Sequence, residues 1–189
     1  NTNINMQEID PSIYGPFSNL IPSCPEMDLS SGNPDISRLS EFGELANQLA
    51  DTGGSDRELE MSQCCLSAIW LFNDFLEQSH LISQTLYSQA GSYLHGIMHR
   101  REGDFANSRH WLRKTVGADC LLAVTKGLPL CSDPALIARC GTPFDPAQLT
   151  TLVEQNLDND SLNLKKLTFT ELWGLFDWCF HQTTFTNSN

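Results

Sequence analysis

The side chains best suited to chemistry are concentrated between residues 93 and 114. That segment holds three of the five histidines and five of the eleven basic residues, in a chain whose formal net charge is −12. His95 and His99 stand four residues apart and so share one face of a helix, which Glu102 continues. Two imidazoles and a carboxylate on one face can bind a divalent metal, or can serve as a base with an orienting acid. We therefore expect a catalytic or metal-binding site at His95, His99 and Glu102.

His80 is a further candidate, because it follows Glu77 at the i, i+3 spacing that supplies ligands in di-iron helical bundles. The pair of His99 and Glu102 has the reverse order, so the di-iron pattern is incomplete. We predict that His80, His95 and His99 converge with at least one carboxylate from Glu77 or Glu102. The alternatives are that His80 caps the C-terminus of its own helix, and that the histidines are hydrogen-bonded structural residues.

Arg100 and Arg101 lie between these residues, and a guanidinium group pairs well with a carboxylate or a phosphate. Gly103 leaves room beside the N-terminus of the next helix, where free amides attract an anion, although Asp104 is expected to cap those amides itself. The alternative is that the arginines pair with acidic side chains on a solvated face. The expected ligand-binding residues are His80, Arg100, Arg101, Asp104 and Asn107.

The same segment resembles one helical hairpin of a tetratricopeptide repeat. Five residues match positions of that motif. They are its two glycines, its turn acid, its aromatic residue and its small residue, in the order Gly96, Gly103, Asp104, Phe105 and Ser108. The match covers about 30 of the 189 residues and lacks the opening Trp and the closing Pro of the motif. The resemblance implies a helical hairpin that turns at Gly103, without a tandem array.

The chain is also similar to an uncharacterised family of helical proteins with a His-Gly-Ile-Met-His-Arg-Arg-Glu-like string that precedes Asp, Asn and Trp. The corresponding residues in this chain are 95–102, Asp104, Asn107 and Trp111. Residues 79–84 and 172–179 look similar to the family as well, so this resemblance spans most of the chain. It implies a helical fold and the location of a site, and it implies no activity.

Helical periodicity dominates the chain beyond residue 34, and no strand-like alternation of useful length occurs. A capping box at Ser55 and Glu58 starts one helix, and a second capping box at Thr168 and Glu171 starts the last one. The helix that begins at Ser55 is expected to end near Gln78, before a break at residues 80–89. The other expected helices span residues 36–49, 91–101, 105–116 and 146–157, with a short one after Asp133.

The sequence therefore predicts a single all-α domain, a helical bundle or array at residues 35–185. Five prolines stand in residues 1–34, and proline removes the backbone donor that helices and strands use. Because that segment also carries apolar side chains, we expect an extended N-terminal arm packed on the domain. Residues 186–189 are expected to form a C-terminal tail.

Composition narrows the classes of partner. With 11 basic against 23 acidic residues, the chain is unsuited to nucleic acid or to an anionic membrane surface. No apolar run is long enough to cross a membrane, and residues 1–7 lack the features of a signal peptide. The seven cysteines form no CxxC pair and are expected to be free thiols of a reducing compartment, which favours a cytoplasmic protein.

Two functions remain open at this point. The first is a His/Arg/Glu polar site on the hairpin at residues 91–116, which binds a small anionic ligand or a divalent metal ion and could be catalytic. The alternative is a non-catalytic module that binds another protein along a tetratricopeptide-like groove. Burial separates the two, since a pocket requires the polar groups to converge in a concave, partly buried place. The sequence leaves the oligomeric state open.

Overall fold

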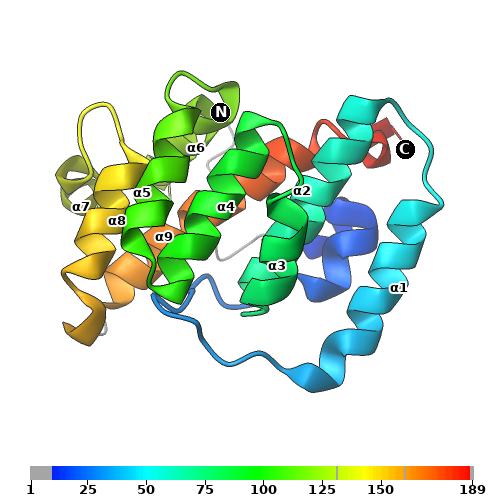
Figure 1. Ribbon diagram of the computed structural model, residues 1–189, viewed down its shortest axis with the longest axis horizontal. Helices are drawn as coiled ribbons and strands as arrows, with labels where there is room; N and C mark the ends of the chain where they lie inside the picture. The colour runs from blue at the N-terminus through cyan, green and yellow to red at the C-terminus, as the bar shows by residue number, and fades with distance from the viewer. Residues whose placement is uncertain (1–9, 131, 160, 188–189) are drawn as a thin grey trace.

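The computed structural model describes residues 10–130, 132–159 and 161–187, and its regular elements are helices (Figure 1). These residues contain no strand, so the predicted all-α class is confirmed. The α-helices are α1 (Leu39–Ala50), α2 (Asp56–Phe72), α3 (Leu76–Ser83), α4 (Gln89–Glu102), α5 (Phe105–Leu112), α6 (Asp119–Gly127), α7 (Pro134–Arg139), α8 (Pro146–Glu154) and α9 (Leu162–Phe180).

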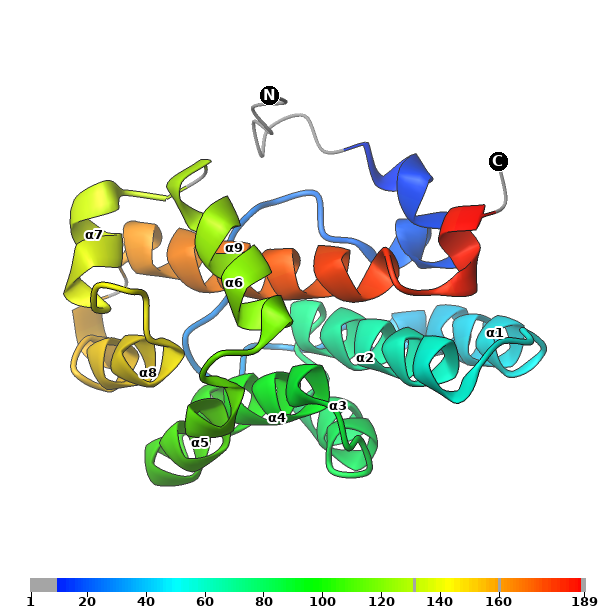
Figure 2. The same cartoon turned by 90° about the horizontal axis from the view of Figure 1, so that it is seen from above.

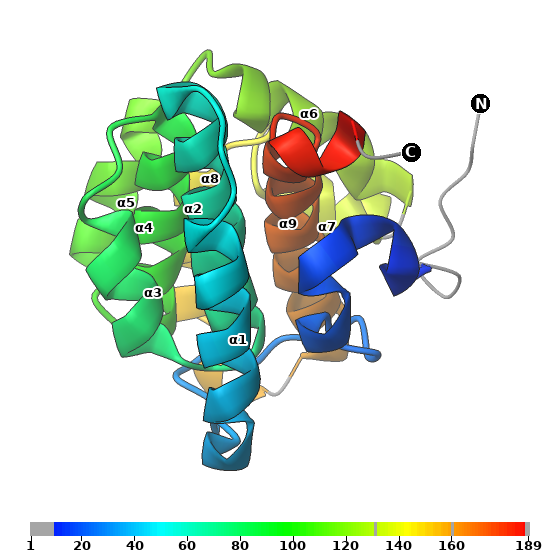
Figure 3. The same cartoon turned by 90° about the vertical axis from the view of Figure 1, so that its right-hand side faces the viewer.

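Helix α9 is the central element of the core. Figures 2 and 3 both show α2 between α9 on one side and the pair of α3 and α4 on the other. Helix α6 packs against α9, and α8 packs against α5. The apolar side chains of α9 lie on all of its sides, which is typical of a helix enclosed by others. Its buried apolar residues include Leu164, Leu167, Phe169, Leu172, Leu175, Phe176 and Phe180.

The described part of the N-terminal segment packs against α9. Tyr14 and Phe17 are buried there, and the Tyr14 hydroxyl donates to Oδ1 of Asp177 at 2.7 Å. The segment is not extended throughout, because Pro11–Leu20 contains two short 3-10 helices that meet at a kink at Tyr14 and Gly15, and Asp10 caps the first of them. Residues 1–9 of the predicted arm lie outside the described residues.

The long helix expected from Ser55 to Gln78 is two helices. The capping box at Ser55 and Glu58 is present, but α2 ends at Phe72 and α3 begins at Leu76. Two side chains of the intervening turn bond to distant parts of the chain: Asn73 Nδ2 donates to the Leu20 carbonyl, and Asp74 accepts from the backbone N–H of Asn33. These bonds favour a turn over a continuous helix. As a result, His80 lies within α3 and not in a break between helices.

Two other boundaries differ from the sequence expectations. Helix α9 starts after Ser161, which accepts a hydrogen bond from the Leu164 N–H, so Thr168 lies inside the helix and caps nothing. The first two residues of the tail expected at residues 186–189 lie in a 3-10 helix, Thr184–Asn187, and residues 188–189 lie outside the described residues.

The six cysteines among the described residues are all free, as predicted, and Cys131 lies outside those residues. Five of the six are buried, and only Cys24 is exposed. Among the described residues, no helix combines the length and the apolar character that a membrane crossing requires.

Candidate functional site

Helices α4 and α5 lie side by side and carry the candidate site (Figure 1). Helix α4 ends at Gly103, whose φ of 90° is a left-handed conformation that glycine adopts without steric cost. Asp104 caps α5 by accepting a hydrogen bond from the Asn107 N–H at 3.1 Å. A Cβ at Gly96 would lie 2.6 Å from Cγ of Leu112, so the helices meet closely where residue 96 has no side chain. Helices α4 and α5 therefore form a helical hairpin that turns at Gly103, and its resemblance to a tetratricopeptide repeat stays a prediction.

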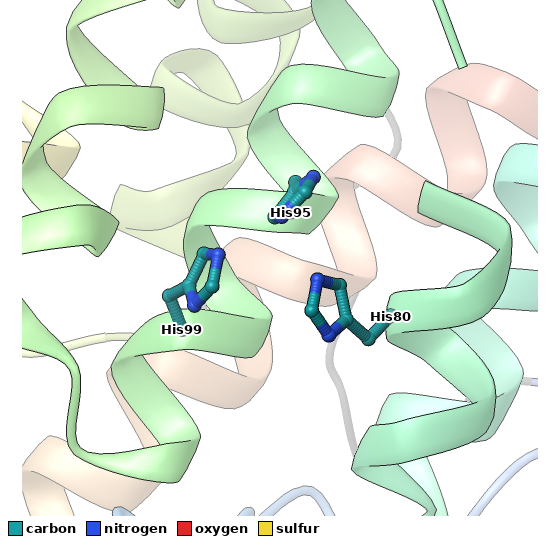
Figure 4. A group of neighbouring side chains, drawn as sticks. All are labelled: His80, His95 and His99. Atoms are coloured by element: carbon teal, nitrogen blue, oxygen red, sulfur yellow. The ribbon is translucent and has the colours of Figure 1, made fainter. Parts of the chain in front are cut away.

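His80, His95 and His99 come together between α3 and α4. Figure 4 shows the three imidazoles around a common space, with His80 contributed by α3 and the other two by α4. One ligand nitrogen from each ring lies within 4.8 Å of the others, and the ring centroids are 4.7 to 5.3 Å apart. His95 and His99 are buried and His80 is half-buried. The predicted convergence of these histidines is therefore observed.

His99 is held at both of its ring nitrogens. Its Nδ1 lies 2.5 Å from Oε1 of Glu102, and its Nε2 lies 3.1 Å from Nδ2 of Asn107. An amide nitrogen can only donate, so Nε2 accepts that bond and Nδ1–H donates to the carboxylate. Glu102 therefore fixes both the orientation and the tautomer of the His99 ring. Glu77, the other carboxylate considered, is exposed and is not part of the group of ligand atoms around the three rings.

His95 is the least satisfied polar side chain of the site. Its Nδ1 is buried and has no hydrogen-bond partner among the described residues. Burial, followed by the charges of His99, His80 and Lys114, lowers the pKa of His95 to about 4, while a hydrogen bond with the backbone of Ser83 opposes the shift. His95 is therefore neutral near pH 7, and a neutral imidazole offers a lone pair to a metal ion.

Trp111, which the sequence suggested only as a core residue, packs directly on the site. Its ring stacks on His95 with centroids 4.3 Å apart and planes 10° apart, and Nζ of Lys114 lies 3.5 Å from the Trp111 ring centroid. A signal for this contact was present in the sequence. His95 and Trp111 each stand eight residues from Gly103, and His99 and Asn107 each stand four residues from it, so both pairs lie at matching positions of the hairpin.

Arg100 takes no part in the histidine cluster. Its side chain is 1% exposed. It forms a bidentate ion pair with Glu171, with Nη1–Oε2 at 2.5 Å and Nη2–Oε1 at 3.2 Å. Its Nε also donates to Oγ1 of Thr150, and the Tyr93 hydroxyl donates to Glu171. The expectation that Arg100 clamps an anionic ligand gains no support from these contacts, because its partners belong to the protein.

Arg101 is likewise bound within the fold. It donates to the carbonyls of Ser30 and Leu71 and to Oδ1 of Asp74, and its side chain is 2% exposed. These bonds tie the N-terminal segment and the turn between α2 and α3 to α4. Asp104 is mainly the cap of α5, although its carboxylate also lies within 4.8 Å of ligand atoms of His99 and Glu102.

Comparison with known proteins found no match to a family model, to a curated protein or to a solved structure. An assignment of function must therefore come from the geometry of the histidine cluster. Three imidazoles that converge from two helices, one of them oriented by a carboxylate, form the donor set of many zinc and other transition-metal centres.

Proposed function

We propose that the protein binds a divalent transition-metal ion at His80, His95 and His99. The observation that carries the proposal is the approach of three ligand nitrogens to within 4.8 Å of one another, with His95 Nδ1 buried and unpartnered. Imidazole nitrogen suits Zn²⁺, Cu²⁺, Ni²⁺ and Fe²⁺. Glu102, bonded to Nδ1 of His99, is the outer carboxylate that commonly orients a metal-bound histidine.

The three rings can bind such an ion once their ligand nitrogens move closer together. Bonds of about 2.0–2.1 Å in a tetrahedral complex put ligand nitrogens about 3.3 Å apart. Because the ligand nitrogens lie within 4.8 Å of one another, they must approach by up to about 1.5 Å. A shift of α3 relative to α4 or rotation of the half-buried His80 provides this movement. Metal binding would then tie α3 to the hairpin of α4 and α5.

The metal centre is favoured over the two other functions considered from the sequence. An anionic ligand depended largely on Arg100 and Arg101, and both guanidinium groups have partners within the fold. An interaction module requires polar groups spread along an open face, whereas His95 and His99 are each 5% exposed. Convergence of buried imidazoles supports a small site rather than a protein-binding groove.

Metal titration of single-histidine variants tests the proposal. We expect EDTA-treated protein to bind one Zn²⁺ in calorimetry, and His80→Ala, His95→Ala and His99→Ala each to weaken binding at least tenfold. His181→Ala is the matched control, because that imidazole is exposed at the end of α9, away from the cluster. Far-UV circular dichroism checks that the helices of each variant persist.

The proposal is wrong if the wild-type protein binds no stoichiometric Zn²⁺, Co²⁺, Ni²⁺ or Cu²⁺. It is also wrong if the double variant His95→Ala, His99→Ala binds metal as tightly as the His181→Ala control. In that case the histidines are structural, and loss of stability would be the only effect of replacing them.

A further inference from the structure

We propose that Asn107 supplies the fourth ligand of this metal centre through its side-chain oxygen. The inference depends on the proposed metal site, and it assigns to α5 a role in that site. Three imidazoles leave one tetrahedral position to fill, and the residue nearest to that position decides whether the centre is closed or open.

The hydrogen bonds of His99 identify which of its atoms faces the metal position. Nδ1 is committed to Glu102 at 2.5 Å, which leaves Nε2 as the atom that can ligate. The position in front of Nε2 is taken by the carboxamide of Asn107, whose Nδ2 is 3.1 Å away. A metal ion on His99 must therefore sit beside Asn107.

The distance between these two side chains is close to the spacing of two ligands of one ion, although the hydrogen bond places Nδ2 of Asn107 at the Nε2 lone pair that the ion itself must use. Bonds of about 2.0–2.2 Å from a tetrahedral ion to nitrogen and oxygen separate those two atoms by about 3.3 Å. The observed 3.1 Å differs from that value by a few tenths of an ångström. Rotation of the carboxamide by half a turn exchanges Nδ2 for Oδ1, and a sideways displacement of the side chain then frees the Nε2 lone pair for the ion and leaves Oδ1 beside it.

The backbone at Asn107 is fixed before any metal arrives. Asp104 caps α5 and accepts the hydrogen bond from the Asn107 N–H at 3.1 Å, which holds residue 107 in the first turn of that helix. Only the side-chain torsions of Asn107 have to change. Asp104 thereby acts as a positioning residue, and its carboxylate is engaged by the backbone it caps.

Glu102 is the rival for the fourth position, and its hydrogen bond argues against it. Its Oε1 holds the Nδ1–H of His99, and turning this carboxylate to the metal would remove the group that orients the ring. With Asn107 as the ligand, both ring nitrogens of His99 keep a role. Nδ1–H donates to Glu102, which orients the ring, and Nε2 binds the ion together with the amide oxygen of Asn107. The three imidazoles and the amide form a neutral ligand set.

A Co²⁺ titration of Asn107 variants tests the assignment, because the visible bands of Co²⁺ report the number and kind of its ligands. Asn107→Asp places a charged oxygen at the same position and is expected to tighten Co²⁺ binding at least tenfold. Asn107→Ala is expected to weaken binding at least fivefold and to shift the visible bands as water replaces the amide. Asn47→Asp adds the same charge on an exposed position of α1 and is expected to match the wild type.

The outcomes separate this inference from the metal site itself. If wild-type Co²⁺ binding depends on the three histidines but both Asn107 variants keep the wild-type affinity and spectrum, the assignment of Asn107 is overturned and the metal site stands. If Asn107→Asp and Asn47→Asp tighten binding equally, the gain is a general charge effect, and the assignment is again overturned. Absence of Co²⁺ binding by the wild-type protein removes the metal site and the inference together. Thermal unfolding in EDTA identifies any variant whose fold has changed, and Asn107→Asp, which keeps the size of the side chain, then carries the test.

Discussion

His95 and Trp111 lie eight residues on either side of Gly103, and their rings stack 4.3 Å apart with planes 10° apart. His99 and Asn107 lie four residues on either side of the same glycine and are joined at 3.1 Å. The hairpin thus gives each histidine of α4 one partner on α5. The candidate site depends on the register of these two helices as much as on the histidines themselves.

Replacement of Trp111 tests how much this stacking contributes. We expect Trp111→Ala to lower the free energy of unfolding by about 2 kcal/mol, because it removes the packing of a half-buried ring and its contact with His95. Trp111→Phe keeps an aromatic surface under His95 and should cost about half as much. Urea unfolding in EDTA measures both values, and equal losses for the two variants would show that the stacking contributes nothing of its own.

Gly96 sets the distance between α4 and α5. A Cβ there would lie 2.6 Å from Cγ and 3.3 Å from the backbone nitrogen of Leu112, so Gly96→Ala must push the helices apart. We expect a loss of about 1–3 kcal/mol in the free energy of unfolding, together with weaker metal binding.

Gly43→Ala is the matched control for this change. Gly43 also lies inside a helix, and a Cβ there meets nothing within 4 Å, so alanine should stabilise the protein by up to about 1 kcal/mol. Opposite signs for the two variants in urea unfolding are expected. A neutral or stabilising effect of Gly96→Ala would contradict close packing at this position.

The parts of the site that follow from short-range rules could be predicted from the sequence. The spacing of His95 and His99 put them on one face, and Gly103 with Asp104 marked the turn. The position of His80 within α3 was not predictable in the same way. The break before α3 depends on Asn73 and on other turn residues that bond to the N-terminal segment, far away in the sequence.

The roles of the arginines were not predictable either, for the same reason. Glu171, the partner of Arg100, is 71 residues away along the chain, and Ser30 is equally distant from Arg101. A charge cluster in the sequence shows which residues need partners and leaves open whether those partners come from a ligand or from the fold. Here the buried acid Glu171 shows no pattern that would link it to Arg100 before the helices are packed.

The ion pair of Arg100 and Glu171 makes a prediction about stability. Glu171 is fully buried, so Glu171→Gln leaves the Arg100 charge without a counter-charge and is expected to cost about 3–5 kcal/mol. The double change Arg100→Met, Glu171→Leu should recover a large part of that loss. The partly exposed pair of Arg109 and Glu154 is the control, and Glu154→Gln should cost less than about 1 kcal/mol in the same urea titration.

We expect the metal-free protein to become less stable as the pH is lowered, because of His95. Burial and the charges of His99, His80 and Lys114 lower its pKa to about 4 from 6.5, so the folded state binds fewer protons than the unfolded chain. The stabilisation is complete above pH 6.5 and is lost as the pH falls towards 4, by roughly 1–2 kcal/mol after allowance for solvent screening.

The variant His95→Gln isolates this effect. Glutamine does not titrate, so urea unfolding in EDTA between pH 7 and pH 4.5 should show a shallower loss of stability than in the wild-type protein. Parallel pH profiles for the wild type and His95→Gln would show that His95 titrates normally in the folded protein.

Glu102 is expected to control metal affinity without binding the metal. Its Oε1 accepts from Nδ1 of His99 at 2.5 Å, and loss of such an outer carboxylate typically weakens metal binding 10–100-fold. We expect Glu102→Ala to raise the Zn²⁺ dissociation constant by that factor. The helices should persist, because the Glu102 side chain is 38% exposed and Glu102 is the last residue of α4.

Glu44→Ala is the control, because it removes an equally negative, exposed side chain from α1 and should leave the dissociation constant unchanged. Calorimetric titration at one ionic strength compares the two variants, and equal affinities would mean that Glu102 does not orient His99.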